Sequence, residues 1–275
     1  MFKCILLILF AVSSVSAAEI RLLPTPKQLK TSGYFAVNHP SFTLRSNWGK
    51  IISPAREKLF TDTLSARLGW KKVSRNGFEI ILKKSDFKNS SKEYYELDIT
   101  PQNIRISAGN AEGLFRGISR FLSLITTQTV RLEDNKIILP KLTIKDHPDN
   151  KERIFQINLR QVYAHTPKTQ MLETAYLLID RAAEMQFNHV MLMIGGSMKL
   201  DGHPEINPHG PVWEKDEIRK LVTRVHNRGM KCGPLINSIG HAAAGPYICP
   251  IYDKTGKKVI GTDVTNPEFD KLFFR

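Results

Sequence analysis

Apolar and polar positions follow their clearest pattern in residues 187–237. The run at 187–194 (FNHVMLMI) is nearly continuously apolar, which is typical of a strand buried on both faces in a parallel sheet. Residues 214–228 then place apolar side chains at helical spacing, and Gly229 ends that pattern. A second apolar run at 230–237 restarts a strand. This order predicts a β-α-β unit, and such units build parallel sheets with right-handed crossovers.

A further strand and helix are predicted just before this unit. Residues 153–159 have the pattern of a strand, and Thr166-Pro167 marks the start of a helix. The region therefore holds about three strand-helix units, whereas a closed (β/α)8 TIM barrel has eight over roughly 250 residues. We expect either a small open α/β sheet or the first part of a TIM barrel. The apolar residues 272–274, which begin a helical pattern, favour a barrel that continues beyond Arg275.

The preceding residues, 19–147, predict a small α+β domain. A helix begins at Ser53-Pro54 and ends at Gly69. The remaining pattern predicts strands at 78–82, 95–99, 104–106 and 136–146 and an amphipathic helix at 114–125. A polar segment with a proline follows at 146–152 and marks a domain boundary. We therefore divide the chain into a signal peptide at 1–18, an α+β domain at 19–150 and part of a barrel at 151–275.

The first 18 residues have the three parts of a secretory signal peptide. Lys3 supplies the positive charge, residues 4–12 are apolar, and small residues at 15–18 offer a cleavage site. The apolar run is shorter than the roughly 20 residues that span a bilayer, so we expect no stable membrane anchor. The sequence thus predicts a secreted or periplasmic protein.

Composition and charge bear on whether the chain binds nucleic acid. The chain is 41% hydrophobic, as globular proteins are, and its net charge is +14. Such a charge suits either a nucleic-acid partner or a basic, solvated surface. Lysines and arginines are scattered without a clustered face, which favours the solvated surface and no nucleic acid. After cleavage only Cys232 and Cys249 remain; they either pair or are buried singly, and the position of Cys232 in a core strand favours the second.

Several short motifs occur in sequence along the front domain, the crossing between domains and the barrel region. The hairpin at 95–106 is followed by Gly-Leu-Phe-Arg-Gly-Ile at 113–118, and the crossing between domains carries Ile144, Asp146, Pro148 and Arg153. Residues 234–241 (PLINSIGH) and 265–268 (TNPE) follow. In this order and spacing the chain resembles glycoside hydrolase family 20, the β-N-acetylhexosaminidase type, over most of residues 22–274.

The resemblance implies an activity and its chemistry. Members of the family remove terminal N-acetylhexosamine residues from glycans with retention, and the 2-acetamido oxygen of the sugar acts as the nucleophile. An adjacent Asp-Glu pair orients that group and protonates the leaving oxygen. The pair follows the fourth barrel strand, so the resemblance places it beyond Arg275 and implies no catalytic residue within this chain. The pair Asp216-Glu217 begins a helix, and we interpret it as complementing the helix dipole.

The resemblance also implies substrate-binding residues. Arg153 matches the family arginine that bonds sugar hydroxyls, although it could equally form a salt bridge at the barrel floor. His241 matches a family histidine beside the site and has a structural alternative. His203 lies in a polar loop after a strand and could be only solvated. We expect no cofactor and no metal site, because His203 and His209 lack a carboxylate partner at fixed spacing.

Departures from the family pattern keep other functions open. Ile154 follows Arg153 where the family has glycine, Asn158 stands at an aspartate position, and Leu235 and Asn237 replace acidic residues. One alternative is another barrel glycosidase with a similar front domain, of the α-glucuronidase or O-GlcNAc-hydrolase kind. Another is a non-catalytic carbohydrate-binding protein, which the lost carboxylates favour.

The leader generates the first testable prediction. We expect the exported protein to begin near residue 18 or 19, because small residues at 15–18 suit signal peptidase. N-terminal sequencing of the secreted protein checks this, and material that still begins at Met1 would contradict it.

Overall fold

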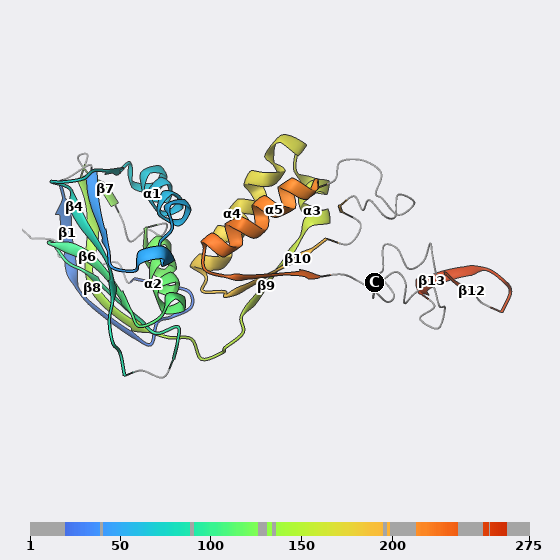
Figure 1. Cartoon of the computed structure of the whole chain (residues 1–275), viewed down its shortest axis with the longest axis horizontal. Coiled ribbons are helices and arrows are strands. Elements are labelled where there is room, and N and C mark those ends of the chain that lie inside the picture. Colours follow the sequence, from blue (N-terminus) through green and yellow to red (C-terminus); the bar gives the residue numbers. More distant parts are fainter. Residues whose placement is uncertain are drawn as a thin grey trace, which may run out of the picture.

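The structure is a computed structural model that describes residues 20–38, 41–88, 91–125, 131–133, 136–194, 197–198, 213–235, 250–252 and 254–262. It consists of a front part, built around a mixed sheet, and a second part in which parallel strands and helices pack together (Figure 1). Residues 147–153 connect the two parts. The helices of the described residues include none long and apolar enough to cross a bilayer.

The front sheet has the strand order β1-β8-β5-β6-β4-β2-β3, with β7 paired to β8. Antiparallel pairs join β1, β8, β5 and β6, and parallel pairs join β6, β4, β2 and β3. The strands are β1 (Gln28–Val37), β2 (Ser41–Ser46), β3 (Lys71–Lys72), β4 (Phe78–Lys84), β5 (Tyr95–Ile99), β6 (Asn103–Ala108), β7 (Arg131–Glu133) and β8 (Lys136–Asp146). The predicted hairpin and the strand at 136–146 are thus confirmed.

Two long helices cover the face of this sheet that points toward the second part (Figure 1). They are α1 (Pro54–Leu68) and α2 (Ala111–Leu124), and a short 3-10 helix, η1 (Gly49–Ile51), precedes α1. The Ser53 hydroxyl accepts a hydrogen bond from the Arg56 amide at 3.4 Å, so the predicted helix start at Ser53 is confirmed. The core between helices and sheet is apolar and includes the fully buried residues Leu64, Trp70, Ile80, Leu97, Ile106 and Phe121.

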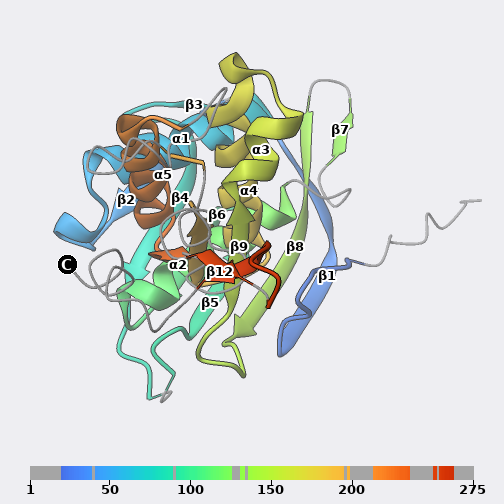
Figure 2. The same ribbon diagram turned by 90° about the vertical axis from the view of Figure 1, so that its right-hand side faces the viewer.

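The second part contains a parallel sheet in the order β11-β10-β9, with helices on one face (Figures 1 and 2). Its elements are β9 (Ile154–Asn158), α3 (Leu159–His165), the 3-10 helix η2 (Lys168–Gln170), α4 (Met171–Glu184), β10 (His189–Met193), α5 (Lys215–Asn227) and β11 (Lys231–Leu235). The strand, helix and strand predicted at 187–194, 214–228 and 230–237 are confirmed as far as these residues are described. A separate antiparallel pair is formed by β12 (Pro250–Tyr252) and β13 (Lys258–Thr262).

Burial along β10 differs from the prediction. Val190 and Leu192 are buried under the helices, but His189, Met191 and Met193 on the other face are only half-buried. The expected burial on both faces is therefore wrong for the described residues, because helices cover a single face of this sheet. The apolar run at 187–194 nevertheless gave the strand itself correctly, since its alternate members reach the core.

Several elements were not predicted, β2, β3 and β7 among them, and three others are informative. The first is β1, whose alternation is broken by a register shift between Thr31 and Tyr34 against β8. The second is α3, a helix of seven residues that is too short to show a periodic pattern. The third is the β12–β13 pair in a segment expected to be a loop.

The contact of α4 with α5 is organised by a buried carboxylate. Asp180 accepts hydrogen bonds from Arg224 at 2.6 Å and 3.0 Å and from Arg228 at 2.7 Å and 2.8 Å. Burial alone would raise the pKa of Asp180, but these hydrogen bonds outweigh it, and the net pKa lies below its ordinary value. Arg228 also donates to the Thr63 hydroxyl of α1 at 3.2 Å, so the cluster extends to the front part.

We expect Asp180→Asn to lower the free energy of unfolding by about 3–5 kcal/mol at pH 7, because it leaves two buried guanidinium groups without their carboxylate. A folded-state pKa below the unfolded value means that this stability is present above the unfolded pKa of about 4 and is lost as the pH falls through the folded pKa. Urea unfolding at pH 7 and pH 3 measures both effects.

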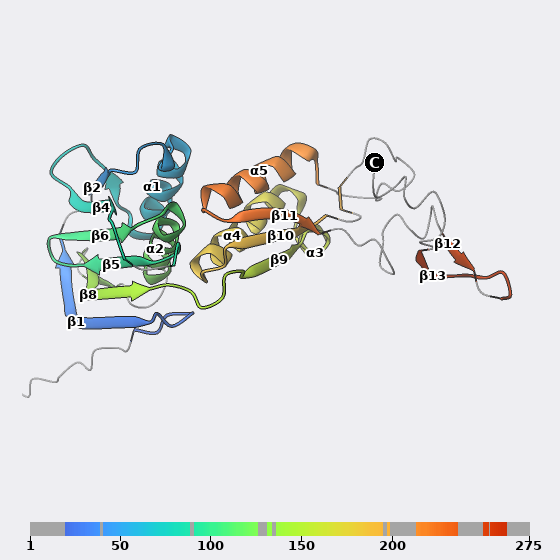
Figure 3. The same ribbon diagram turned by 60° about the horizontal axis from the view of Figure 1, so that its bottom comes forward.

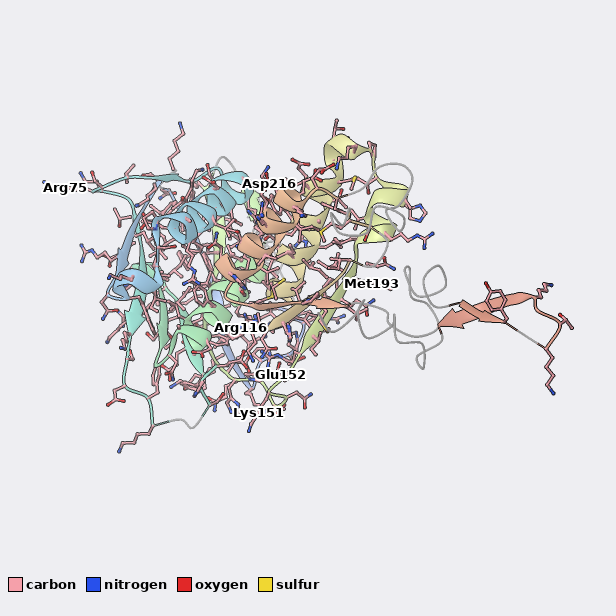
Figure 4. The ribbon with its side chains drawn as sticks, turned by 45° about the vertical axis from the view of Figure 1, so that its right-hand side comes forward. Arg75, Arg116, Lys151, Glu152, Met193 and Asp216 are labelled. Atoms are coloured by element: carbon pink, nitrogen blue, oxygen red, sulfur yellow. The ribbon has the colours of Figure 1, made fainter. Side chains whose placement is uncertain are left out.

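Asp216→Asn is the matched control, since the Asp216 side chain is 78% exposed on α5 (Figure 4). We expect a change within about 0.5 kcal/mol for this control. Equal losses in the two variants, or a loss for Asp180→Asn that persists unchanged at pH 3, would contradict the role given to Asp180.

Candidate functional site

The candidate site lies at the carboxyl ends of β9, β10 and β11. The three strands run parallel, and their register places Asn158, Met193 and Leu235 in one row at these ends. The front part packs at the opposite, amino ends, so the carboxyl ends point away from it (Figure 3). Ligands of open α/β sheets and of barrels bind at the carboxyl ends of the strands. The architecture therefore singles out this end of the second part.

The face of the sheet that is free of helices adds polar groups to this end. Because side chains alternate along a strand, Gln156, Met191 and Gly233 form a row below Asn158, Met193 and Leu235. The Gln156 amide nitrogen lies 3.4 Å from the Met193 sulfur. Carboxamide groups can donate to and accept from neutral hydroxyl or amide groups, but they cannot transfer a proton at neutral pH. Toward the carboxyl ends this face offers hydrogen bonding and apolar contact, and the imidazole of His189 lies on the same face at the amino end of β10.

Arg153 lies at the other end of β9. Its guanidinium donates to both carboxylate oxygens of Glu93, at 2.7 Å and 3.0 Å, and to the carbonyl oxygens of Gln186 at 2.7 Å and Asn150 at 2.6 Å. The length of β9 separates it from the carboxyl ends, which is about 16 Å at roughly 3.3 Å per residue. Arg153 thus forms the salt bridge that was named as its alternative role, and the sugar contact stays a prediction. The residue of β9 that does lie at the carboxyl end is Asn158.

The other two predicted binding residues, His203 and His241, lie outside the described residues. Both remain predictions. In the sequence, His203 follows β10 and His241 follows β11.

The Asp216-Glu217 pair lies in the first turn of α5, as predicted. Glu217 accepts hydrogen bonds from the Lys168 ammonium at 2.7 Å and from the Glu214 amide at 2.8 Å, and Asp216 pairs with Arg219. Both carboxylates thus have cationic partners, and Glu217 also satisfies an amide at the helix start. Among the described residues, no group of three or more His, Cys, Asp or Glu side chains could hold a metal ion.

Two residues near the site were not predicted as part of it. The Asn158 side-chain oxygen accepts from the Arg160 amide at 3.1 Å, so Asn158 begins α3. Trp213 is fully buried; its indole nitrogen donates to the Leu159 carbonyl at 3.0 Å, and its amide donates to the Ser197 carbonyl at 2.8 Å. An asparagine directly after a strand is a signal that could have been recognised. Trp213 stands in no sequence pattern that would have marked it as part of the site.

Comparison with known proteins can now be set against this geometry. The sequence model described as "Glycosyl hydrolase family 20, domain 2" matches residues 19–147, which is the front part. The chain is related to glycoside hydrolase family 20. Its front part is thus similar to the second domain of that family, and the parallel strands follow it directly along the chain.

Two characterised relatives support the relationship at low identity. Lacto-N-biosidase of Bifidobacterium bifidum is 25% identical over 188 residues, covering 66% of this chain and 15% of its own length. Beta-hexosaminidase of Vibrio furnissii is 21% identical over 266 residues, covering 87% of this chain and 41% of its own length. The chain therefore spans less than half of each of these relatives.

Solved structures extend the likeness of fold beyond the front part. The family 20 exo-β-N-acetylglucosaminidase of Vibrio harveyi matches with a TM-score of 0.68 at 15% identity, covering 91% of this chain and 43% of that one. The D313A mutant of Streptomyces plicatus β-hexosaminidase gives 0.69 at 18% identity, covering 93% and 56%. Because the family model stops at residue 147, coverage of this extent includes the second part as well.

The role of Asn158 as the cap of α3 can be tested by removing or keeping its acceptor oxygen. We expect Asn158→Ala to lower the free energy of unfolding by about 1 kcal/mol, because the Arg160 amide loses its acceptor. Asn158→Asp keeps an acceptor oxygen and should stay close to the parent. Urea unfolding of both variants checks this, and equal losses would show that Asn158 does not act as the cap of α3.

Proposed function

We propose that this chain is the front domain and the first barrel strands of an exported glycosidase that removes terminal N-acetylhexosamine residues from glycans. The carrying observation is the order of its parts: a family 20 second domain, matched at 19–147, is followed by parallel strands whose carboxyl ends point away from it. The relatives named hexosaminidase and N-acetylglucosaminidase support this substrate class. Export rests on the signal-peptide pattern of the first 18 residues.

The proposed chemistry is substrate-assisted and retaining. The acetamido oxygen of the sugar attacks the anomeric carbon, a carboxylic acid protonates the leaving oxygen, and a neighbouring carboxylate orients the acetamido group. We propose that this acid pair belongs to residues beyond Arg275, as the greater length of the relatives supports. The described part of this chain would contribute one wall of the sugar site through Gln156 and Asn158.

One observation favours a second candidate, a non-catalytic carbohydrate-binding protein. The two rows nearest the carboxyl ends on the helix-free face consist of two carboxamides, two thioethers, a leucine and a glycine, which can bind a sugar without cleaving it. The two candidates differ in whether a longer protein that contains residues 1–275 hydrolyses a sugar substrate or only binds it.

We expect the purified 275-residue chain to be nearly inert on a chromogenic N-acetylglucosaminide, because a general acid is typically worth about 10²–10⁴-fold in rate. The corresponding longer protein should hydrolyse the same substrate with retention, which NMR of the released sugar reports. Robust turnover by residues 1–275 would contradict the placement of the acid, and binding without turnover by the longer protein would favour the carbohydrate-binding candidate.

The variant Asp216→Asn/Glu217→Gln serves as the control in both proteins. Both carboxylates have cationic partners at the start of α5, so we expect activity in the longer protein to stay within about threefold of the parent. A loss of 100-fold or more, on the order expected for an acid, would assign this pair to catalysis.

A further inference from the structure

The motif Gly-Leu-Phe-Arg-Gly-Ile at 113–118 lies in α2, where the front part meets the second part. Gly113 allows the segment before β5 to lie directly on this helix, since a Cβ there would overlap the Tyr94 carbonyl oxygen. The Gly113 amide also donates to the Lys92 carbonyl at 3.1 Å. The carboxylate of Glu93, between these two residues, is thereby held near the next turn of α2.

The next turn of α2 contacts the ends of the helices in the second part. Gly229, which follows α5 with a φ of +71°, lies so close to the Phe115 ring that a Cβ at this position would overlap it. Arg116 beside it has a side chain only 1% exposed. It donates to the Phe187 carbonyl, which follows α4, and to the Gly229 carbonyl at 3.5 Å.

Arg116 and Arg153 share one carboxylate. Glu93 accepts both bonds of the Arg153 fork and lies 3.7 Å from the Arg116 guanidinium. Burial lowers the pKa of Arg116 to about 10, Glu93 opposes this change, and the nearby charge of Arg153 adds to it. Arg116 therefore stays charged at neutral pH, and Glu93 is the group that offsets two neighbouring cations.

The carbonyl oxygens held by these two arginines have a common place in the fold. Asn150 precedes β9, Gln186 and Phe187 precede β10, and Gly229 precedes β11. Those of Gln186, Phe187 and Gly229 also lie just after the ends of α4 and α5, where the helix dipole favours positive charge. Two guanidinium groups, one of them that of Arg116 (Figure 4), thus contact the chain just before each of three neighbouring parallel strands.

We propose that Glu93, Arg116 and Arg153 form an arginine junction through which the front domain positions the strands of the second part. On this proposal the front domain has a positioning function rather than a sugar-binding one. It fixes the amino ends of β9, β10 and β11, and the parallel register carries that placement to the carboxyl ends where the candidate site lies. Arg116 and Arg153 are positioning residues, and Glu93 keeps both of them paired.

Hydrogen-deuterium exchange of the 275-residue chain tests the junction. We expect Arg116→Met to accelerate amide exchange in β9, β10 and β11 on the order of 100-fold, because the opening of these strands is no longer opposed by the buried pair. Amides of β5 and β6 in the front sheet should change by less than about threefold. Arg75→Met, at an exposed arginine far from α2 (Figure 4), should change neither set.

Two results of this measurement would overturn the proposal. One is unchanged exchange in β9–β11 of Arg116→Met. The other is equal acceleration in β5 and β6, which would show a general loss of stability in place of positioning.

A charge-balance measurement keeps the proposal testable even if Arg116→Met does not fold. Glu93→Gln should accelerate exchange in β9–β11, whereas Glu112→Gln, at an exposed acid of the same α2, should not. Adding Arg153→Met to Glu93→Gln removes a cation together with its carboxylate, so the double variant should exchange more slowly than the product of the two single effects predicts. Strictly multiplicative effects would overturn the junction as a unit.

Discussion

The neutralisation of the buried guanidinium of Arg116 and the partly exposed one of Arg153 by a single carboxylate is the constraint on which the second part depends. Arg116 comes from the front domain and Arg153 from the connection to β9, and Glu93 lies between them. Desolvated cations are costly unless they are paired and their donors are satisfied. The carbonyl oxygens of Phe187 and Gly229, which follow α4 and α5, accept from Arg116 and meet part of that need, and the Arg116 Nε lies 3.7 Å from Glu93 without a hydrogen bond. The front part thus supplies donors and the second part supplies acceptors to the same contact.

This constraint and the direction of the strands together decide where the site can lie. A parallel sheet has all its amino ends at one edge, and here that edge is occupied by the front domain (Figure 3). The carboxyl ends are the edge of this sheet that the front domain leaves uncovered. The buried Trp213 ties the segments that follow β9 and β10 to each other, since it donates to the carbonyl groups of Leu159 and Ser197. The front domain is therefore remote from a sugar bound at the carboxyl ends, yet it acts on the placement of the strands that carry the site.

Local signals in the sequence predicted the elements that depend on local physics. Ser53 and Gly229 mark helix ends because their backbone or side chain satisfies a terminal group, and such signals are legible without a structure. The strand β1 was missed because its register shift interrupts the alternation, and the covering of β10 was misjudged because a single strand does not show how many layers will pack on it. Arg153 shows the limit for the site. Its residue type suits a sugar, but only the structure reveals that Glu93, distant in sequence, already occupies its fork.

The same contact bears on the meaning of the +14 charge. Arginines with side chains turned into the contact bind carbonyl or carboxylate groups across it: Arg67 donates to Glu184 at 2.6 Å and Arg56 donates to the His226 carbonyl at 3.1 Å. A planar fork can serve two acceptors at once, which a lysine ammonium does less well. The lysines of β3, by contrast, are exposed on the edge of the front sheet, where charge discourages pairing with another strand. Part of the positive excess therefore reflects the contact between the two parts and the protection of a sheet edge, two demands of the fold that need no anionic partner.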